Sequence, residues 1–245
     1  MIDRFVLAHG FTQTARSWST FSGCLQELLA GAQTVAVDLP GHGNAPPPND
    51  SDLWESAERL VDVGGAATYV GYSMGGRVSL HAALAHPERV RALVLIGATA
   101  GIDDLDERLA RRAADERLAG HIEAVGVDTF IDEWLAMALF AGLTERTAMR
   151  DDRLRNTAVG LAASLRATGT GTQEPLWQQL GVIDVPVLVL AGQHDTKFRA
   201  IGERMAGLLS TPTFEVIAGA GHSVHLEQPA TTAAAIARWH RLRIS

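Results

Sequence analysis

The chain has 245 residues, 47% of them hydrophobic, and a formal net charge of −7. This length is typical of a single domain with a substantial buried core, and the acidic charge argues against a nucleic-acid-binding surface. No apolar run approaches the roughly 18 residues that a membrane-spanning helix needs. We therefore expect neither a nucleic acid nor a membrane as a partner.

The beginning of the chain lacks the charged, apolar and cleavage regions of a signal peptide, because its short apolar stretch runs directly into a glycine turn. A cytoplasmic location is therefore expected. Cys24 is the only cysteine, so the sequence provides neither a disulfide framework nor a thiolate cluster.

Short β-rich runs alternate with longer helix-like segments, which is the pattern of a parallel sheet covered by helices on both faces. The runs with strand character are 4–8, 33–38, 67–72, 91–96, 186–191 and 213–218. Each run leads into a loop that contains Gly, His, Asp or Ser. Because ligands bind at the carboxyl ends of strands in such sheets, we expect the chemistry in these loops.

A gap of about ninety residues separates the fourth run from the fifth and interrupts an otherwise regular spacing. Within it, amphipathic helices are predicted over 103–119, 128–140 and 153–166. We predict a single domain, 1–245, with a helical cap, 103–167, inserted between the fourth and fifth strands.

The third run ends in Gly-Tyr-Ser-Met-Gly at 71–75, which matches the G-x-S-x-G nucleophile elbow, and a helix-like stretch follows. The glycines make room for a strained serine backbone and expose the hydroxyl of Ser73. A serine hydroxyl is activated by a histidine that takes its proton and by a carboxylate that orients the histidine. An acid and a base are therefore expected downstream of Ser73.

Asp195 follows the fifth run, and His222 follows the sixth run directly after Gly-Ala-Gly. His225 could replace His222 by spacing, but the glycine turn places an imidazole at position 222 at the edge of the sheet. The chain order Ser, Asp, His is that of serine enzymes with this elbow. We predict Ser73, Asp195 and His222 as the catalytic triad.

A His-Gly-Phe-Thr turn at 9–12 follows the first run, where a strand-to-helix turn can supply a second oxyanion amide. The expected donors are the backbone N–H groups of Phe11 and Met74. The sequence contains no HExxH, CxxC or clustered carboxylate pattern and no GxGxxG motif, so we predict neither a metal nor a cofactor.

These motifs resemble the α/β-hydrolase superfamily over essentially the whole chain. The resemblance implies an α/β fold with a mainly parallel sheet of about six strands, flanked by helices and carrying an inserted helical cap. One departure is visible after the second run, where Asp-Leu-Pro-Gly-His-Gly at 38–43 is followed by Asn44 in place of the usual serine.

A narrower similarity is to the 2-succinyl-6-hydroxy-2,4-cyclohexadiene-1-carboxylate synthases of menaquinone biosynthesis, which eliminate pyruvate from a polycarboxylate. The matching segments are the elbow with its arginine at 71–77, the acid loop at 192–198, and Trp134, Leu139-Phe140-Ala141, Arg155-Asn156 and 169–173 between them. The resemblance implies a small-molecule polycarboxylate substrate, with Ser73 acting as a base.

The resemblance also implies that Arg77, Arg111 and Arg155 bind carboxylates and that Tyr72 and Trp134 complete the pocket wall. Guanidinium groups suit this role because they stay charged and bind carboxylates in bidentate fashion. Other arginines lie near two of these positions, namely Arg108, Arg112 and Arg117 near the first and Arg150 and Arg153 near the second. Only Arg155 precedes an asparagine, as in the family.

Two other functions fit the same motifs. The triad could hydrolyse a carboxylic ester or a carbon–carbon bond by nucleophilic attack, or the pocket could sense a small ligand without turnover. The arginines argue against a neutral ester, because burying cations without an anionic partner is costly.

Overall fold

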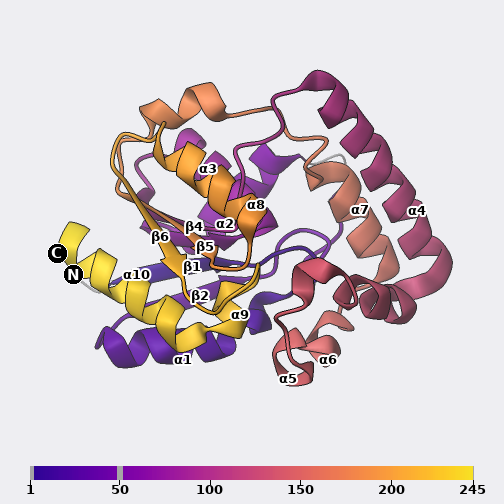
Figure 1. Cartoon of the computed structure of the whole chain (residues 1–245), viewed down its shortest axis with the longest axis horizontal. Coiled ribbons are helices and arrows are strands. Elements are labelled where there is room, and N and C mark those ends of the chain that lie inside the picture. Colours follow the sequence, from indigo (N-terminus) through magenta and orange to yellow (C-terminus); the bar gives the residue numbers. More distant parts are fainter. Residues whose placement is uncertain (1–2, 49–51, 245) are drawn as a thin grey trace.

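The computed structural model describes residues 3–48 and 52–244. Within these ranges six parallel strands form one sheet in the order β2-β1-β3-β4-β5-β6 (Figure 1). The strands are β1 Arg4–Ala8, β2 Gln33–Val37, β3 Ala67–Tyr72, β4 Val90–Ile96, β5 Val187–Gly192 and β6 Pro212–Ile217. The prediction of an α/β fold with about six strands is confirmed, and each strand differs from its expected bounds by one residue at most at either end.

Helices cover both faces of the sheet (Figure 1). They are α1 Ser19–Leu28, α2 Leu53–Gly64, α3 Met74–Ala85, α4 Leu105–Leu135, α5 Glu145–Ala148, α6 Arg150–Arg153, α7 Ala158–Thr168, α8 Thr196–Ala206, α9 Val224–Glu227 and α10 Pro229–Arg243, with 3-10 turns η1 Ala15–Trp18, η2 Ala138–Phe140 and η3 Trp177–Val182. Helices α1 and α10 pack together on one face, and α2 and α3 pack together on the other. No helix in the described ranges is long and apolar enough to cross a membrane.

Neighbouring residues of each central strand enter different cores. In β3, Tyr69 packs in the core beneath α2 and α3, whereas Val70 packs in the core beneath α1 and α10. The same alternation separates Val189 from Leu190 in β5. Each fully buried aliphatic side chain contributes about 1.5–3 kcal/mol. The two cores therefore hold the carboxyl ends of the strands, and the loops that follow them, in fixed relative positions.

The segment between β4 and β5 differs from its expected division into helices. Helix α4 consists of two helical stretches that meet at Gly126, whose φ of 81° and ψ of 167° are not helical, so a second start lies close to the expected residue 128, while the first stretch continues beyond its expected end at 119. Only glycine adopts that backbone conformation readily, so the bend lies at this residue. Helix α4 packs along α7 around a third apolar cluster, away from the sheet (Figure 1). Its role as a cap stays a prediction.

The helix expected over 153–166 is also shorter than its pattern indicated. Helix α6 ends at Arg153, and α7 begins at Ala158 because the Thr157 hydroxyl accepts the N–H of Gly160 as an N-cap. Arg155 therefore lies in the turn between the two helices.

Candidate active site

Ser73 occupies the sharp turn between β3 and α3. Its backbone has φ 51° and ψ −109°, and its N–H donates to the carbonyl oxygen of Ile96 at 2.8 Å. A Cβ on Gly71 would collide with the carbonyl of Gly75, and one on Gly75 would collide with the carbonyl of Ala8. The two glycines of the motif are thus required by close backbone contacts. A non-glycine residue in this region costs on the order of 1–3 kcal/mol, a cost typical of a functional turn.

Asp195 and His222 form a buried pair beside this turn. Oδ2 of Asp195 accepts from Nδ1 of His222 at 2.6 Å, and the side chains are 5% and 3% exposed. The Oδ1 atom accepts the N–H of Phe198 at 3.2 Å, which fixes the carboxylate at the start of α8. With Nδ1–H directed to Asp195, Nε2 of the imidazole is left to take a proton.

The imidazole of His222 is held by rings and by backbone. Its centroid lies 4.5 Å from that of Phe198 and 5.2 Å from that of Tyr72. A Cβ on Gly97 would lie 2.9 Å from Cε1 of His222. Sequence reasoning missed Gly97, although its place directly after β4 was a signal for it. The alternative base His225 packs instead between Trp18 and Tyr72, with both pairs of ring centroids 4.4 Å apart.

Glu227 fixes the loop that carries His222. One carboxylate oxygen accepts the N–H of Gly221 at 2.6 Å, and the other accepts the N–H of Ser223 at 2.9 Å. The two amides flank His222, so one side chain orients the backbone on both sides of the imidazole. A Cβ on Gly142 would collide with the same carboxylate. Sequence reasoning missed this residue, although an acid five positions after the predicted base was a visible signal.

Two neutral histidines shape the turn after β1. Nε2 of His9 accepts the N–H of Leu39 at 3.0 Å, and Nε2 of His42 accepts the N–H of Thr12 at 3.3 Å. Burial lowers the pKa of His9 to about 4 and the pKa of His42 well below its ordinary value. Both rings are therefore uncharged acceptors at neutral pH. They hold the backbone around Phe11, the predicted oxyanion donor.

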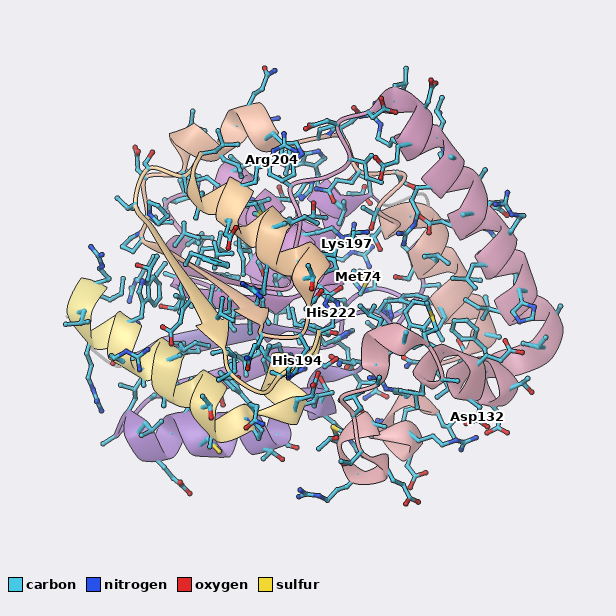
Figure 2. All side chains as sticks on the ribbon, in the orientation of Figure 1. Met74, Asp132, His194, Lys197, Arg204 and His222 are labelled. Atoms are coloured by element: carbon cyan, nitrogen blue, oxygen red, sulfur yellow. The ribbon has the colours of Figure 1, made fainter. Side chains whose placement is uncertain are left out.

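A cavity of about 450 Å³ opens over these elements. Most of the predicted site residues line it: Phe11, Tyr72, Ser73, Met74, Arg77, Arg111, Trp134 and His222. Asp195 lies behind the imidazole of His222 as seen from the cavity. Figure 2 shows Met74 and His222 close together, with Lys197, at the end of the sheet that faces α4 and α7. The structure thus brings the predicted triad and both predicted oxyanion residues to one place.

Two of the predicted arginines reach the cavity from different elements. Arg77 lies on α3 and is 7% exposed, and its Nη1 donates to the carbonyl of Thr168 at 2.6 Å. Burial lowers its pKa to about 10, so it remains a cation at neutral pH. Arg111 lies on α4, is half-exposed, and pairs with the buried carboxylate of Asp115 at 2.7 Å.

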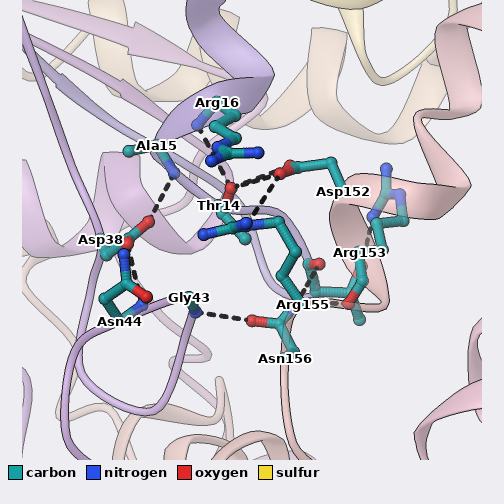
Figure 3. A network of polar contacts seen from close by, with 11 residues as sticks. Thr14, Ala15, Arg16, Asp38, Gly43, Asn44, Asp152, Arg153, Arg155 and Asn156 are labelled. Carbon is teal, nitrogen blue, oxygen red and sulfur yellow. Dashed lines mark hydrogen bonds and ion pairs between the residues drawn. The ribbon is translucent and has the colours of Figure 1, made fainter.

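The structure does not bring Arg155 to the cavity, which Arg153 lines instead. Arg155 lies 3.8 Å from a carboxylate oxygen of Asp152, outside the cavity. Arg153 is 1% exposed, and its guanidinium donates to the carbonyl of Ala148 and to the hydroxyl of Thr12. Figure 3 shows the two side chains extending in different directions from the turn. Burial lowers the pKa of Arg153 to about 10, so this cation also persists at neutral pH.

Arg153 lines the cavity in place of the predicted Arg155 because Asn156 anchors the turn that carries both arginines. Nδ2 of Asn156 donates to the carbonyl of Thr12 at 2.7 Å, and its Oδ1 accepts the N–H of Gly43 at 2.9 Å (Figure 3). These bonds hold the backbone between α6 and α7 so that Arg153 faces inward. The asparagine that singled out Arg155 in the sequence therefore positions the arginine two residues earlier.

Comparisons with known proteins agree with the motifs. A model of the alpha/beta hydrolase family matches residues 5–235. A putative 2-succinyl-6-hydroxy-2,4-cyclohexadiene-1-carboxylate synthase of Bacillus subtilis (strain 168) is 38% identical over 240 residues, covering 93% of this chain and 86% of that protein. The synthase of that name from Enterobacter sp. (strain 638) is 32% identical, covering 98% and 92%.

The structure of MenH from S. aureus superimposes with a TM-score of 0.91 at 28% identity and covers 99% of this chain and 94% of that one. The resemblance inferred from the motifs is thus confirmed over nearly the whole length. The chain belongs to the alpha/beta hydrolase family and, within it, to the group of 2-succinyl-6-hydroxy-2,4-cyclohexadiene-1-carboxylate synthases.

Proposed function

We propose that this chain eliminates pyruvate from 2-succinyl-5-enolpyruvyl-6-hydroxy-3-cyclohexene-1-carboxylate, a step of menaquinone biosynthesis, with Ser73 as the base. The observation that carries the proposal is the pair of buried guanidinium groups, Arg77 and Arg153, in one cavity with Ser73. Their hydrogen bonds run to neutral oxygens of Thr168, Gln173, Ala148 and Thr12. A buried cation is stabilised far better by an anionic ligand, so a carboxylate-rich substrate fits this cavity.

The two cations come from different parts of the fold. Arg77 follows Ser73 by one turn of α3, and the charged side chains that shift its pKa are Arg111 and Asp115. Arg153 lies at the end of α6 beside the turn after β1, and Asp152 and Tyr72 act on its pKa. A substrate with more than one carboxylate could therefore engage a cation in each region of the cavity.

The proposed reaction is a proton abstraction followed by loss of a leaving group. Nε2 of His222 takes the proton of the Ser73 hydroxyl, and the serine oxygen removes a proton from the substrate ring. The bond between the ring carbon and the enolpyruvyl oxygen then breaks with formation of a ring double bond, and the departing enolate takes the proton of the imidazolium to give pyruvate, which restores neutral His222. Asp195 orients the ring and stabilises its charged form.

The amides after the two tight turns have a role in this scheme. Met74 begins α3, so its N–H lies at a helix N-terminus, and Phe11 lies in the turn held by His9 and His42. We assign their N–H groups to the negative charge that develops on the substrate in the transition state. Relatives named for this reaction, at 38% and 32% identity, support the proposed reaction.

The test is an assay of the purified chain with the enolpyruvyl substrate, in which pyruvate release is compared with hydrolysis of 4-nitrophenyl acetate. The proposal predicts pyruvate release with a kcat/KM at least roughly a hundredfold above that for the neutral ester, since only the polycarboxylate engages the arginines. Ester hydrolysis without pyruvate release would assign the triad to acyl transfer instead. Tight binding without turnover of either compound would indicate a sensor.

A further inference from the structure

Gln13 lies in the turn after β1, two residues beyond the proposed oxyanion residue Phe11. Its side chain is 2% exposed and lines the cavity. Oε1 accepts the N–H of Gly10 at 3.3 Å, which sets the orientation of the amide. Nε2 is buried and has no hydrogen-bond partner among residues 3–48 and 52–244. A buried donor without an acceptor is unfavourable unless a ligand supplies one.

Two other buried donors of the same cavity share this property. Nη2 of Arg153 and Nε1 of Trp134 also have no hydrogen-bond partner in the described part of the chain. Like Nε2 of Gln13, they can donate and cannot accept. A ligand with several acceptor oxygens would satisfy all three donors around this cavity at once. The chemical class that supplies these oxygens beside a guanidinium is a carboxylate.

Arg153 and Trp134 are connected through contacts with Phe140, and Arg153 is connected to Gln13 through its chain neighbour Thr12. Arg153 donates through Nη1 to the hydroxyl of Thr12, the neighbour of Gln13 in the chain. The Arg153 guanidinium carbon lies 5.9 Å from the ring centroid of Phe140, which is 5.6 Å from that of Trp134. Gln13 thus belongs to the region of Arg153, adjacent to the turn that carries the Phe11 amide. Arg77 and Arg111 serve a different region of the cavity.

We infer that Gln13 is a substrate-binding, specificity-determining residue that donates through Nε2 to a carboxylate bound by Arg153. The inference deepens the proposed function and rests on it for the identity of the substrate. A neutral amide suits this position because it adds a directed donor without burying a second cation beside Arg153. Oε1 is already occupied by the N–H of Gly10, so the amide presents its donor side to the ligand.

A purely structural role for Gln13 would lie in its bond to Gly10. The substitution Gln13→Glu separates the two roles, because glutamate keeps an oxygen for the N–H of Gly10 and replaces the donor by an anion. If Gln13 serves only the turn, Gln13→Glu should change KM no more than its added negative charge does, and the uncharged Gln13→Met should leave the phthalate affinity unchanged. If Gln13 binds a carboxylate, glutamate removes the hydrogen bond and repels the ligand.

The experiment measures two quantities for the unmodified chain, for Gln13→Glu and for Gln178→Glu, a matched change at an exposed glutamine on η3. The first is KM for pyruvate release. The second is the Kd of phthalate, a ring dicarboxylate used as a probe, read from tryptophan fluorescence. We expect Gln13→Glu to raise both at least roughly tenfold with kcat changed less, and Gln178→Glu to change neither.

The outcomes separate this inference from the proposed function. If the unmodified chain releases no pyruvate but Gln13→Glu still weakens phthalate, the proposed function fails and the role of Gln13 stands. Unchanged KM and unchanged phthalate affinity, or no phthalate binding by the unmodified chain, would overturn the inference. Should Gln13→Glu fail to fold, Gln13→Met removes the donor without adding charge, and the same criteria apply to it.

Discussion

The carboxylate of Asp195 lies 2.6 Å from Nδ1 of His222 and at the same time accepts an N–H from the first turn of α8, that of Phe198. A strand-end loop, a helix N-terminus and the imidazole are therefore joined through one buried side chain. This arrangement fixes the tautomer of His222 and directs Nε2 away from the acid, which is the condition for a general base.

Substitution of Asp195 by asparagine should lower kcat for pyruvate release by about 10³–10⁴ while KM changes little. An amide can present its NH₂ group to Nδ1, which favours the wrong tautomer of the imidazole. Because Phe198 still finds an oxygen acceptor, the melting temperature should move little. Steady-state kinetics with a thermal melt check this, and a fall of less than tenfold in kcat would show that Asp195 does not orient the base.

Arg153 and Arg155 form a matched pair for testing which arginine serves the substrate. Arg153→Met should raise KM for the polycarboxylate by at least tenfold, because it removes a buried cation from the cavity wall. Arg155→Met should leave KM within about twofold, since that side chain pairs with Asp152 outside the cavity. The reverse pattern would restore the assignment made from the sequence.

Glu227 is expected to act on the reaction through the His222 loop without contacting substrate. In Glu227→Gln, one of the two oxygens that accept the N–H groups of Gly221 and Ser223 is replaced by a donor. We predict a kcat lowered about tenfold with an unchanged KM. Glu203→Gln, on the exposed face of α8, is the control. A change in KM alone would place Glu227 in substrate binding instead.

The buried histidines make stability depend on pH. Burial lowers the pKa of His9 to about 4, below its value near 6.5 in the unfolded chain, so between these values only the unfolded state takes up the proton. The contribution of His9 to the free energy of unfolding is therefore fully present above pH 6.5 and is lost progressively as the pH falls toward 4. His9 alone should reduce the free energy of unfolding by about 2 kcal/mol between pH 7 and pH 5.

Urea unfolding at the two pH values measures this term. In His9→Gln, whose Oε1 can replace Nε2 as the acceptor for Leu39, the drop between pH 7 and pH 5 should be smaller by the same amount. An equal drop in both chains would mean that His9 is not the group that takes up the proton.

The strands, and the loops that carry Ser73, Asp195 and His222, could be predicted because their signals are local; the role of these three residues as a triad stays a prediction. A run of β-branched residues followed by glycine, serine, aspartate or histidine indicates a strand and the loop after it. Each such run forms a strand of the sheet. Helix boundaries between β4 and β5 were harder, because the bend at Gly126 and the cap at Thr157 depend on packing of α4 against α7. Periodicity alone does not mark either position.

The missed site residues act across the chain. Hydrogen bonds to backbone groups are made by Glu227, His42 and Asn156. The residues next to them in the sequence do not indicate which backbone groups these are. The sequence pattern favoured Arg155 over Arg153 for the same reason. Only the anchoring of the turn by Asn156 determines which arginine faces the cavity. Long-range hydrogen bonds to the backbone thus determine which residues shape the loops of the site and which arginine lines the cavity, and the motifs do not indicate either.

Ser73 is the proposed base for elimination, and the most direct test of this role is the initial rate of pyruvate release from the enolpyruvyl substrate. Ser73→Ala is compared with Ser79→Ala, a buried serine further along the same helix. We predict that Ser73→Ala lowers kcat by at least roughly 10² and that Ser79→Ala leaves it within about threefold. Pyruvate release at the unmodified rate by Ser73→Ala would contradict the role of Ser73 as the base.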